Sequence, residues 1–174
     1  MVTAFSGGFI TLLCTVLVDQ LTKSLIVYRV GLSKVIPVIP HLNVVHIRNK
    51  GISFGIMNSS NVWQQAAILS IAILLCGCLV YQLFQSKQKV FSLCVGAILG
   101  GAIGNIIDRI VHGAVIDFID FYIKEAYFLN LHIIDWHWPA FNVADSAVVV
   151  GVIGLVVVTH KPGKGKSSLF RKSK

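Results

Sequence analysis

Charged residues are scarce in this 174-residue chain, and acidic residues are scarcer than basic ones. Charged side chains make up 13% of the sequence, whereas a soluble domain usually carries roughly 25%. Seven residues are acidic and 15 are Lys or Arg, which gives a net charge of +8. Hydrophobic residues account for 55% of the chain, and the mean hydropathy is +0.79. This composition argues against a soluble domain and indicates a membrane protein that forms one compact unit.

Cysteine is also sparse, and its pattern predicts neither a disulfide framework nor a zinc site. The four cysteines are Cys14, Cys76, Cys78 and Cys94, and all of them lie in apolar stretches. Cysteine in such surroundings usually acts as a small hydrophobic residue. Cys76 and Cys78 are too close for the common zinc spacings and have no second pair to complete a site. No cofactor or metal is expected.

Four long apolar stretches are predicted to cross the membrane. A spanning helix needs about 20 mostly apolar residues, and the stretches that qualify are residues 4–28, 62–84, 90–107 and 141–159. The connector 29–61 mixes β-branched residues with Pro and Gly, which indicates short strands and turns. We therefore expect an all-α membrane protein with four transmembrane helices. A small extracytoplasmic β-rich segment lies between helices one and two, and residues 1–160 form a single domain.

The distribution of Lys and Arg predicts the orientation of these helices. Basic residues occur in the short connector 85–89 and in the tail 161–174, which places both in the cytoplasm together with the N-terminus. The longer connectors 29–61 and 110–138 then lie outside. The first of them is itself basic, but long loops follow this rule poorly. A basic tail can bind nucleic acid, yet no readout motif accompanies it, so no nucleic-acid partner is expected.

Aromatic and small residues add two local expectations. Trp136 and Trp138 come just before the fourth helix, and tryptophan favours the boundary between membrane and water. Gly96, Gly100 and Gly104 are spaced four residues apart in the third helix, where such small faces let membrane helices approach closely.

Polar residues converge near the outer ends of the predicted helices. Asp19 and Lys23 are one helical turn apart, and so are Asn142 and Asp145. Intramembrane charges usually find partners, so Asp19 and Lys23 are interpreted as a structural ion pair. Spacing alone favours a structural network over a catalytic pair for the remaining acids, because ion-pair networks also gather carboxylates. Asp120 is interpreted as a solvated or interfacial acid.

Five motifs together resemble the bacterial lipoprotein signal peptidases, also called signal peptidase II. They occur in that family's order and are DQLTK (19–23), NKGISFG (49–55), GGAIGNIIDR (100–109), VIDFIDF (115–121) and FNVADS (141–146). The resemblance implies an aspartic endopeptidase of the bacterial inner membrane, with its active site toward the periplasmic face. Such an enzyme removes signal peptides from diacylglyceryl-modified prolipoproteins by cutting before the lipidated cysteine. The stretch from Tyr122 to Trp138 looks longer than this family would lead us to expect.

The resemblance also implies roles for individual residues. Asp117 and Asp145 match the catalytic pair of the family. The positions that orient the substrate match Asn49, Asn105, Arg109 and Asn142, and the supporting positions match Asp19, Lys23, Gly51, Gly104 and Asp108. The implied partners are prolipoproteins that carry a diacylglyceryl-cysteine, together with membrane lipids, and the protein is expected to act as a monomer.

Other functions stay open on the residues alone. A proton-coupled transporter also places acids in the membrane, but here they gather on one side and helix 62–84 has no ionisable residue. A metal-dependent hydrolase could use His132, Asp135 and His137, but the HExxH pattern is absent. A purely structural subunit is disfavoured by the density of the motifs.

Overall fold

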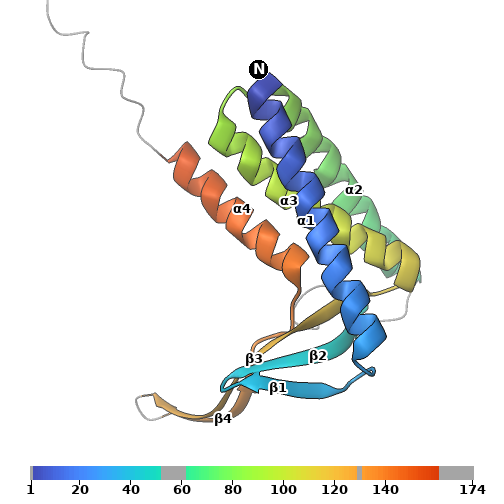
Figure 1. Ribbon diagram of the computed structural model, residues 1–174, viewed down its shortest axis with the longest axis vertical. Coiled ribbons are helices and arrows are strands. Elements are labelled where there is room, and N and C mark those ends of the chain that lie inside the picture. Colours follow the sequence, from blue (N-terminus) through green and yellow to red (C-terminus); the bar gives the residue numbers. More distant parts are fainter. Residues whose placement is uncertain (1, 52–61, 129–130, 161–174) are drawn as a thin grey trace, which may run out of the picture.

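The computed structural model shows a helical bundle above a small antiparallel sheet (Figure 1). It describes residues 2–51, 62–128 and 131–160; the basic tail 161–174 and residues 52–55 of the NKGISFG motif lie outside this part of the chain. The helices are α1 (Val2–Arg29), α2 (Val62–Gln85), α3 (Lys89–His112) and α4 (Val143–Thr159). The strands are β1 (Val35–Ile39), β2 (Leu42–Asn49), β3 (Val115–Phe128) and β4 (Leu131–His137).

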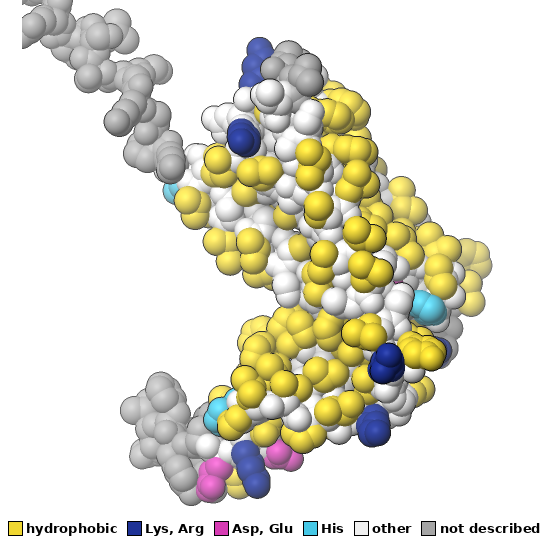
Figure 2. Space-filling view, viewed as in Figure 1, with side chains coloured by type: hydrophobic (Ala, Val, Ile, Leu, Met, Phe, Trp, Pro, Cys, Tyr) yellow, Lys and Arg dark blue, Asp and Glu magenta, His cyan; other side chains and the backbone are white. Residues whose placement is uncertain are grey.

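The predicted membrane-spanning character holds for α1, α2 and α3. Each is long and apolar enough to cross a membrane, whereas α4 is apolar but only 17 residues long. Large hydrophobic side chains stay exposed on the outer faces of the helices, for example Leu21 at 61% and Ile153 at 58%. Figure 2 shows such side chains over much of the visible bundle surface. A surface of this kind suits lipid rather than water.

The helix α3 is central and contacts α1, α2 and α4. Its glycines make the close approach feasible, as the four-residue spacing predicts. A Cβ atom on Gly96 would overlap the backbone carbonyl of Gly8 in α1, and one on Gly101 would overlap the carbonyl of Ala144 in α4. The helix ends at Gly113, whose φ of 66° is a left-handed conformation that glycine adopts without steric cost.

The four strands form one sheet in the order β1-β2-β3-β4, with antiparallel neighbours. The strands β1 and β2 are the β-rich segment expected between the first two helices. The prediction was incomplete, because β3 and β4 fall in the connector 110–138, for which no strand was predicted. In β3, Val115, Ile116 and Phe118 are all buried, so both faces are covered and the alternation that marks a half-buried strand is missing.

A hydrophobic cluster holds the sheet against the bundle. Ile26 and Val30 at the end of α1 pack with Ile116 and Phe118 of β3, and Val143 at the start of α4 joins them. Burying apolar side chains of this size contributes about 1.5–3 kcal/mol each. The cluster therefore fixes β3 relative to the first turn of α4, which positions the site described next.

Candidate active site

The first turn of α4 begins on a polar cap that includes one of the predicted catalytic acids. Asn142 is the N-cap residue, and its side-chain oxygen accepts a hydrogen bond from the backbone N–H of Asp145 at 2.9 Å. The Asp145 carboxylate in turn accepts from the backbone N–H of Asn142 at 3.3 Å. Asparagine is a preferred N-cap, and an acidic residue three positions later completes the reciprocal pattern. Local sequence thus places the Asp145 carboxylate beside Asn142.

The same Asn142 side chain reaches the second predicted acid. Its Nδ2 donates to Oδ1 of Asp117 on β3 at 2.8 Å, and both residues are almost completely buried. Each acid also receives a second amide donor: Asn49 Nδ2 lies 3.0 Å from Asp117 Oδ2, and Asn105 Nδ2 lies 2.8 Å from Asp145 Oδ1. Residues from β2, α3, β3 and α4 therefore converge on two neighbouring carboxyl groups.

The surroundings of Asp117 change its protonation behaviour. Burial raises the pKa of its carboxyl group, and the neighbouring Asp145 carboxylate raises it further, to about 7. Hydrogen bonds from Asn49 and Asn142 and the charge of Lys23 favour the ionised form and oppose the rise. A carboxyl group with a pKa near neutrality suits proton transfer in either direction.

Three predicted supporting residues form a buried ion cluster behind the two acids. Lys23 Nζ lies 2.8 Å from Asp19 Oδ2 and 3.0 Å from Asp108 Oδ2. The same ammonium donates to Asn105 Oδ1 at 2.9 Å, which turns the Asn105 amide nitrogen toward Asp145. The predicted ion pair between Asp19 and Lys23 is confirmed, and Asp108 is its third member.

The cluster also ties the elements of the site together. Asp19 accepts from the backbone N–H of Ala144 in the first turn of α4 at 2.9 Å, and Asp108 accepts from the backbone N–H of Ile116 in β3 at 2.9 Å. Sequence reasoning missed Gln20, whose Nε2 donates to Asp19, Asp108 and the carbonyl of Gly104 at 3.0–3.2 Å. The available signal was a polar amide within an apolar helix.

The remaining predicted residues border this cluster. Arg109 Nη2 donates to the carbonyl of Gly51 at 3.3 Å, and its Nη1 donates to the carbonyl of Asn105 at 3.2 Å. The Arg109 Nε is buried and has no hydrogen-bond partner among the residues that the structure describes. A Cβ atom at Gly104 would overlap the Asp19 carboxylate, so glycine is what lets α1 and α3 share the cluster. The structure brings all the predicted site residues together.

Asp120 was interpreted as a solvated or interfacial acid, and the first of these alternatives is wrong. It is 6% exposed, and its carboxylate accepts from Asn43 Nδ2 at 2.8 Å and lies 2.8 Å from His137 Nδ1. The sequence did not reveal this pairing, because His137 lies on a different strand. Within residues 2–51, 62–128 and 131–160, no group of three or more His, Cys, Asp or Glu residues is arranged to hold a metal ion. The side chain of His132 lies outside the described part.

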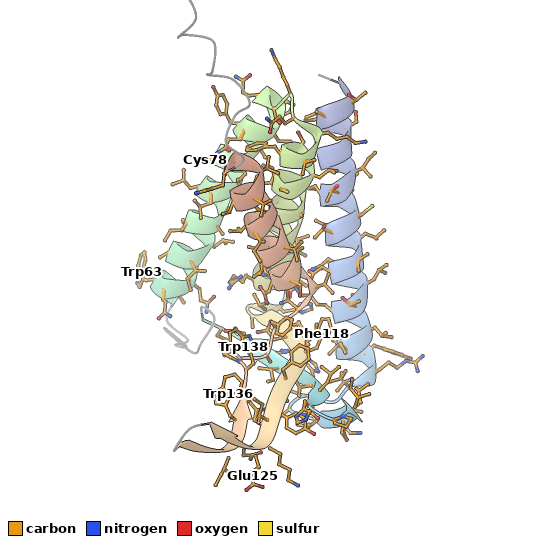
Figure 3. All side chains as sticks on the ribbon, turned by 90° about the vertical axis from the view of Figure 1, so that its left-hand side faces the viewer. Trp63, Cys78, Phe118, Glu125, Trp136 and Trp138 are labelled. Carbon is orange, nitrogen blue, oxygen red and sulfur yellow. The ribbon has the colours of Figure 1, made fainter. Side chains whose placement is uncertain are left out.

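An apolar cavity opens beside Asp145. Its volume is about 430 Å³, and its lining is mostly apolar, with Asp145 and Ser146 among the lining residues. Figure 3 shows Trp138 at the junction between α4 and the sheet. The cavity is lined by Trp138, Pro139, Ala140, Phe141, Asp145, Ser146, Val149 and Val150.

Comparison with known proteins identifies the family of this chain. A family model described as signal peptidase (SPase) II matches residues 11–161. A lipoprotein signal peptidase of Alteromonas mediterranea is 36% identical over 153 residues, which are 87% of this chain and 79% of the relative. One from Burkholderia mallei is 39% identical over 145 residues, covering 83% of this chain and 81% of the relative.

The solved structures give the same result at the level of the fold. A bacterial membrane enzyme determined by the in meso method at 2.3 Å resolution superposes with a TM-score of 0.74 and 29% sequence identity. The match covers 91% of this chain and 93% of that chain. Since the family model spans most of the sequence and the relatives exceed 30% identity, this chain belongs to the signal peptidase II family.

Proposed function

We propose that this chain is an aspartic endopeptidase in which Asp117 and Asp145 are the catalytic pair. Proteins of this family remove signal peptides from prolipoproteins, and this chain cuts a diacylglyceryl-modified precursor just before the lipidated cysteine. The observation that carries the proposal is the arrangement at Asn142, which hydrogen-bonds to both neighbouring carboxyl groups. Asn49 and Asn105 each hold one of these groups from the other side.

Two close carboxyl groups supply both proton transfers that amide hydrolysis needs. They cannot both ionise readily, so the pair keeps one proton. The ionised acid takes a proton from water as the water oxygen attacks the scissile carbonyl carbon. The protonated acid donates to the carbonyl oxygen, which gives a tetrahedral diol. Proton transfer to the amide nitrogen then accompanies cleavage of the carbon–nitrogen bond. The two acids titrate as a coupled unit.

Three polar side chains bind the substrate backbone and keep it aligned with the two acids: Arg109, Asn105 and Asn142. The buried Nε of Arg109 faces no partner within the described residues, and it is available to a substrate carbonyl. The apolar cavity beside Asp145 suits the hydrocarbon parts of the substrate, since its lining is mostly apolar and includes the reacting group.

The chain spans the bacterial inner membrane four times, with α4 as the fourth span. Figure 1 supports this topology, because the N-terminus, the connector between α2 and α3, and the C-terminal end of α4 all lie at the end of the bundle away from the sheet. That connector carries Lys87 and Lys89, which favours the cytoplasmic side. The sheet and the candidate active site then lie at the periplasmic face. The protein works there as a monomer among membrane lipids.

Incubation with two forms of one precursor tests this function. Purified protein in detergent or nanodiscs is expected to cleave a prolipoprotein whose cysteine carries diacylglyceryl and to leave the unmodified precursor intact. Mass spectrometry of the product gives the cut site, which is expected to precede the lipidated cysteine. Cleavage of both forms at equal rates would contradict the proposed specificity, and cleavage of neither would contradict the proposed activity.

The rate of cleavage is expected to fall as the pH rises through about 7. Catalysis needs one protonated acid, and Asp117, whose raised pKa is about 7, loses its proton over this range. A pair of ordinary, independent carboxyl groups would lose this proton near pH 4 instead. Measurement of kcat/KM from about pH 3 to about pH 9 locates the descending limb. A midpoint near pH 4 would show that the two acids do not share a proton.

A further inference from the structure

The hairpin of β3 and β4 extends beyond the rest of the sheet. The strand β3 pairs with β2 only as far as Phe121, whereas residues 122–128 pair with β4 alone. Figure 1 shows this two-stranded ribbon running out beyond the lower end of α4. A two-stranded ribbon is marginally stable in water at best, and the proposed mechanism makes no use of its outer part.

One face of the ribbon is apolar and exposed. Partners directly opposite each other on antiparallel strands share a face, so Ile123 shares a face with Trp136. The backbone N–H of Trp138 donates to the carbonyl of Phe121 at 2.8 Å, which continues the same row toward α4. The exposed fractions of this row are 46% for Phe121, 67% for Ile134, 44% for Trp136 and 47% for Trp138.

The opposite face is polar. It carries the pair Tyr122 and His137 and, farther out, the exposed residues Lys124 and Asp135. Glu125 lies instead on the apolar face, paired with Ile134 at the outer end of the hairpin, and Figure 3 shows its side chain pointing away from the helices. Figure 2 shows acidic and basic side chains on the side of the sheet that faces away from the bundle. The two faces of the ribbon therefore differ in polarity, and the ribbon is amphipathic.

The apolar face is continuous with the outer surface of α4. Trp138 lines the 430 Å³ cavity together with Val149 and Val150, which are 57% and 67% exposed on α4. A second cavity of about 380 Å³ continues from Trp138 to Trp136 and Phe121. In Figure 2, hydrophobic side chains line both sides of the hollow between α4 and the sheet. The surface that meets lipid on α4 thus continues onto the hairpin.

We infer that the apolar face of the β3–β4 hairpin rests in the outer leaflet of the membrane, with Trp136 and Trp138 at the boundary between headgroups and hydrocarbon. The inference rests on the proposed orientation of the chain. Indole rings favour this boundary, and the charges of Lys124 and Asp135 stay in water on the opposite face. The hollow beside Asp145 then opens directly to hydrocarbon, so that a lipidated substrate reaches the site by lateral diffusion.

Tryptophan fluorescence in nanodiscs tests this placement without any substrate. One variant keeps Trp136 as its single tryptophan (Trp63→Phe, Trp138→Phe). The matched control carries its single tryptophan on the polar face of the same hairpin (Trp63→Phe, Trp136→Phe, Trp138→Phe, Lys124→Trp). Both are reconstituted at one protein per disc, in discs with and without brominated phospholipid, and are also titrated with aqueous iodide. Circular dichroism confirms that each variant is folded.

Trp136 is expected to lose fluorescence to brominated lipid and to resist iodide, whereas the tryptophan at position 124 shows the reverse. Quenching of Trp136 by iodide alone would overturn the inference, since the hairpin would then stand in water. Resistance of Trp136 to both quenchers would also overturn it, because protein would then cover that face. The cleavage assay on the unsubstituted chain decides the proposed function separately.

Discussion

Replacing Asp145 with asparagine (Asp145→Asn) is expected to lower the rate of signal peptide cleavage by about 10³-fold, and Asp117→Asn is expected to do the same. General acid–base groups contribute about 10²–10⁴-fold each, and an amide side chain can neither take a proton from water nor donate one to a carbonyl oxygen with comparable ease. Among the described residues, Asp117 and Asp145 are the two acids that hydrogen-bond to Asn142, so neither can be replaced by another nearby carboxyl group. Single-turnover cleavage of the lipidated precursor measures the loss.

The fold is expected to survive both substitutions. The side-chain oxygen of an asparagine at position 145 still accepts from the backbone N–H of Asn142, which preserves the helix cap.

At position 117 the direction of the pKa shift predicts how the substitution changes stability. Because the folded state raises the pKa of Asp117 to about 7, the unfolded chain releases this proton first as the pH rises from about 4. The free energy of unfolding of the wild type therefore falls as the pH rises from about 4 to about 7. Asp117→Asn removes this loss of stability.

Thermal unfolding at pH 8 is thus expected to show Asp117→Asn at least as stable as the wild type. Asp120→Asn is the matched control, since Asp120 is also a buried acid of β3 but bonds to Asn43 and His137 instead of Asn142. It is expected to retain far more activity than the two other variants. Processing of the precursor at the normal rate by Asp117→Asn or Asp145→Asn would end the aspartic peptidase proposal.

Much of the architecture follows from local sequence patterns. Helix existence follows from long apolar runs, and the close packing at Gly96 follows from the spacing of small residues. The pairing of Asp19 with Lys23 follows from helical periodicity, because residues four apart share a face. Each of these features depends on residues that are close together in the sequence, so a short stretch of sequence is enough to predict it.

The arrangement of the candidate site depends on contacts between residues that are far apart in the sequence. Asp108 joins the ion cluster only because α1 and α3 pack closely at Gly104, and Asp120 finds His137 only because β3 pairs with β4. Spacing alone favoured a structural role for the acids; only the resemblance to a family singled out Asp117 and Asp145. The strands β3 and β4 were missed for a related reason, since burial of β3 on both faces removes the alternating pattern.

Lys23→Met is expected to destabilise the protein by about 3–5 kcal/mol, the usual cost of removing one partner from a buried ion pair. The ammonium of Lys23 lies 2.8 Å from the carboxylate of Asp19 and 3.0 Å from that of Asp108, and all three side chains are at most 3% exposed. Methionine preserves much of the aliphatic volume but leaves two carboxylates facing each other without a cation. Unfolding in detergent with increasing denaturant measures the loss, and Ser24→Ala, at an exposed neighbouring position, is the control.

A second substitution separates charge from packing in this cluster. Adding Asp108→Asn to Lys23→Met removes one of the two uncompensated carboxylates, so the double variant is expected to recover part of the lost stability, and the double-mutant cycle gives the coupling between the two residues. Cleavage is expected to stay impaired, because Asn105 loses the ammonium that orients its amide toward Asp145. If the double variant were instead destabilised by the sum of the two single effects, Lys23 and Asp108 would act independently. The cluster would then be a packing feature of α1 and α3, without the electrostatic coupling that links it to the catalytic pair.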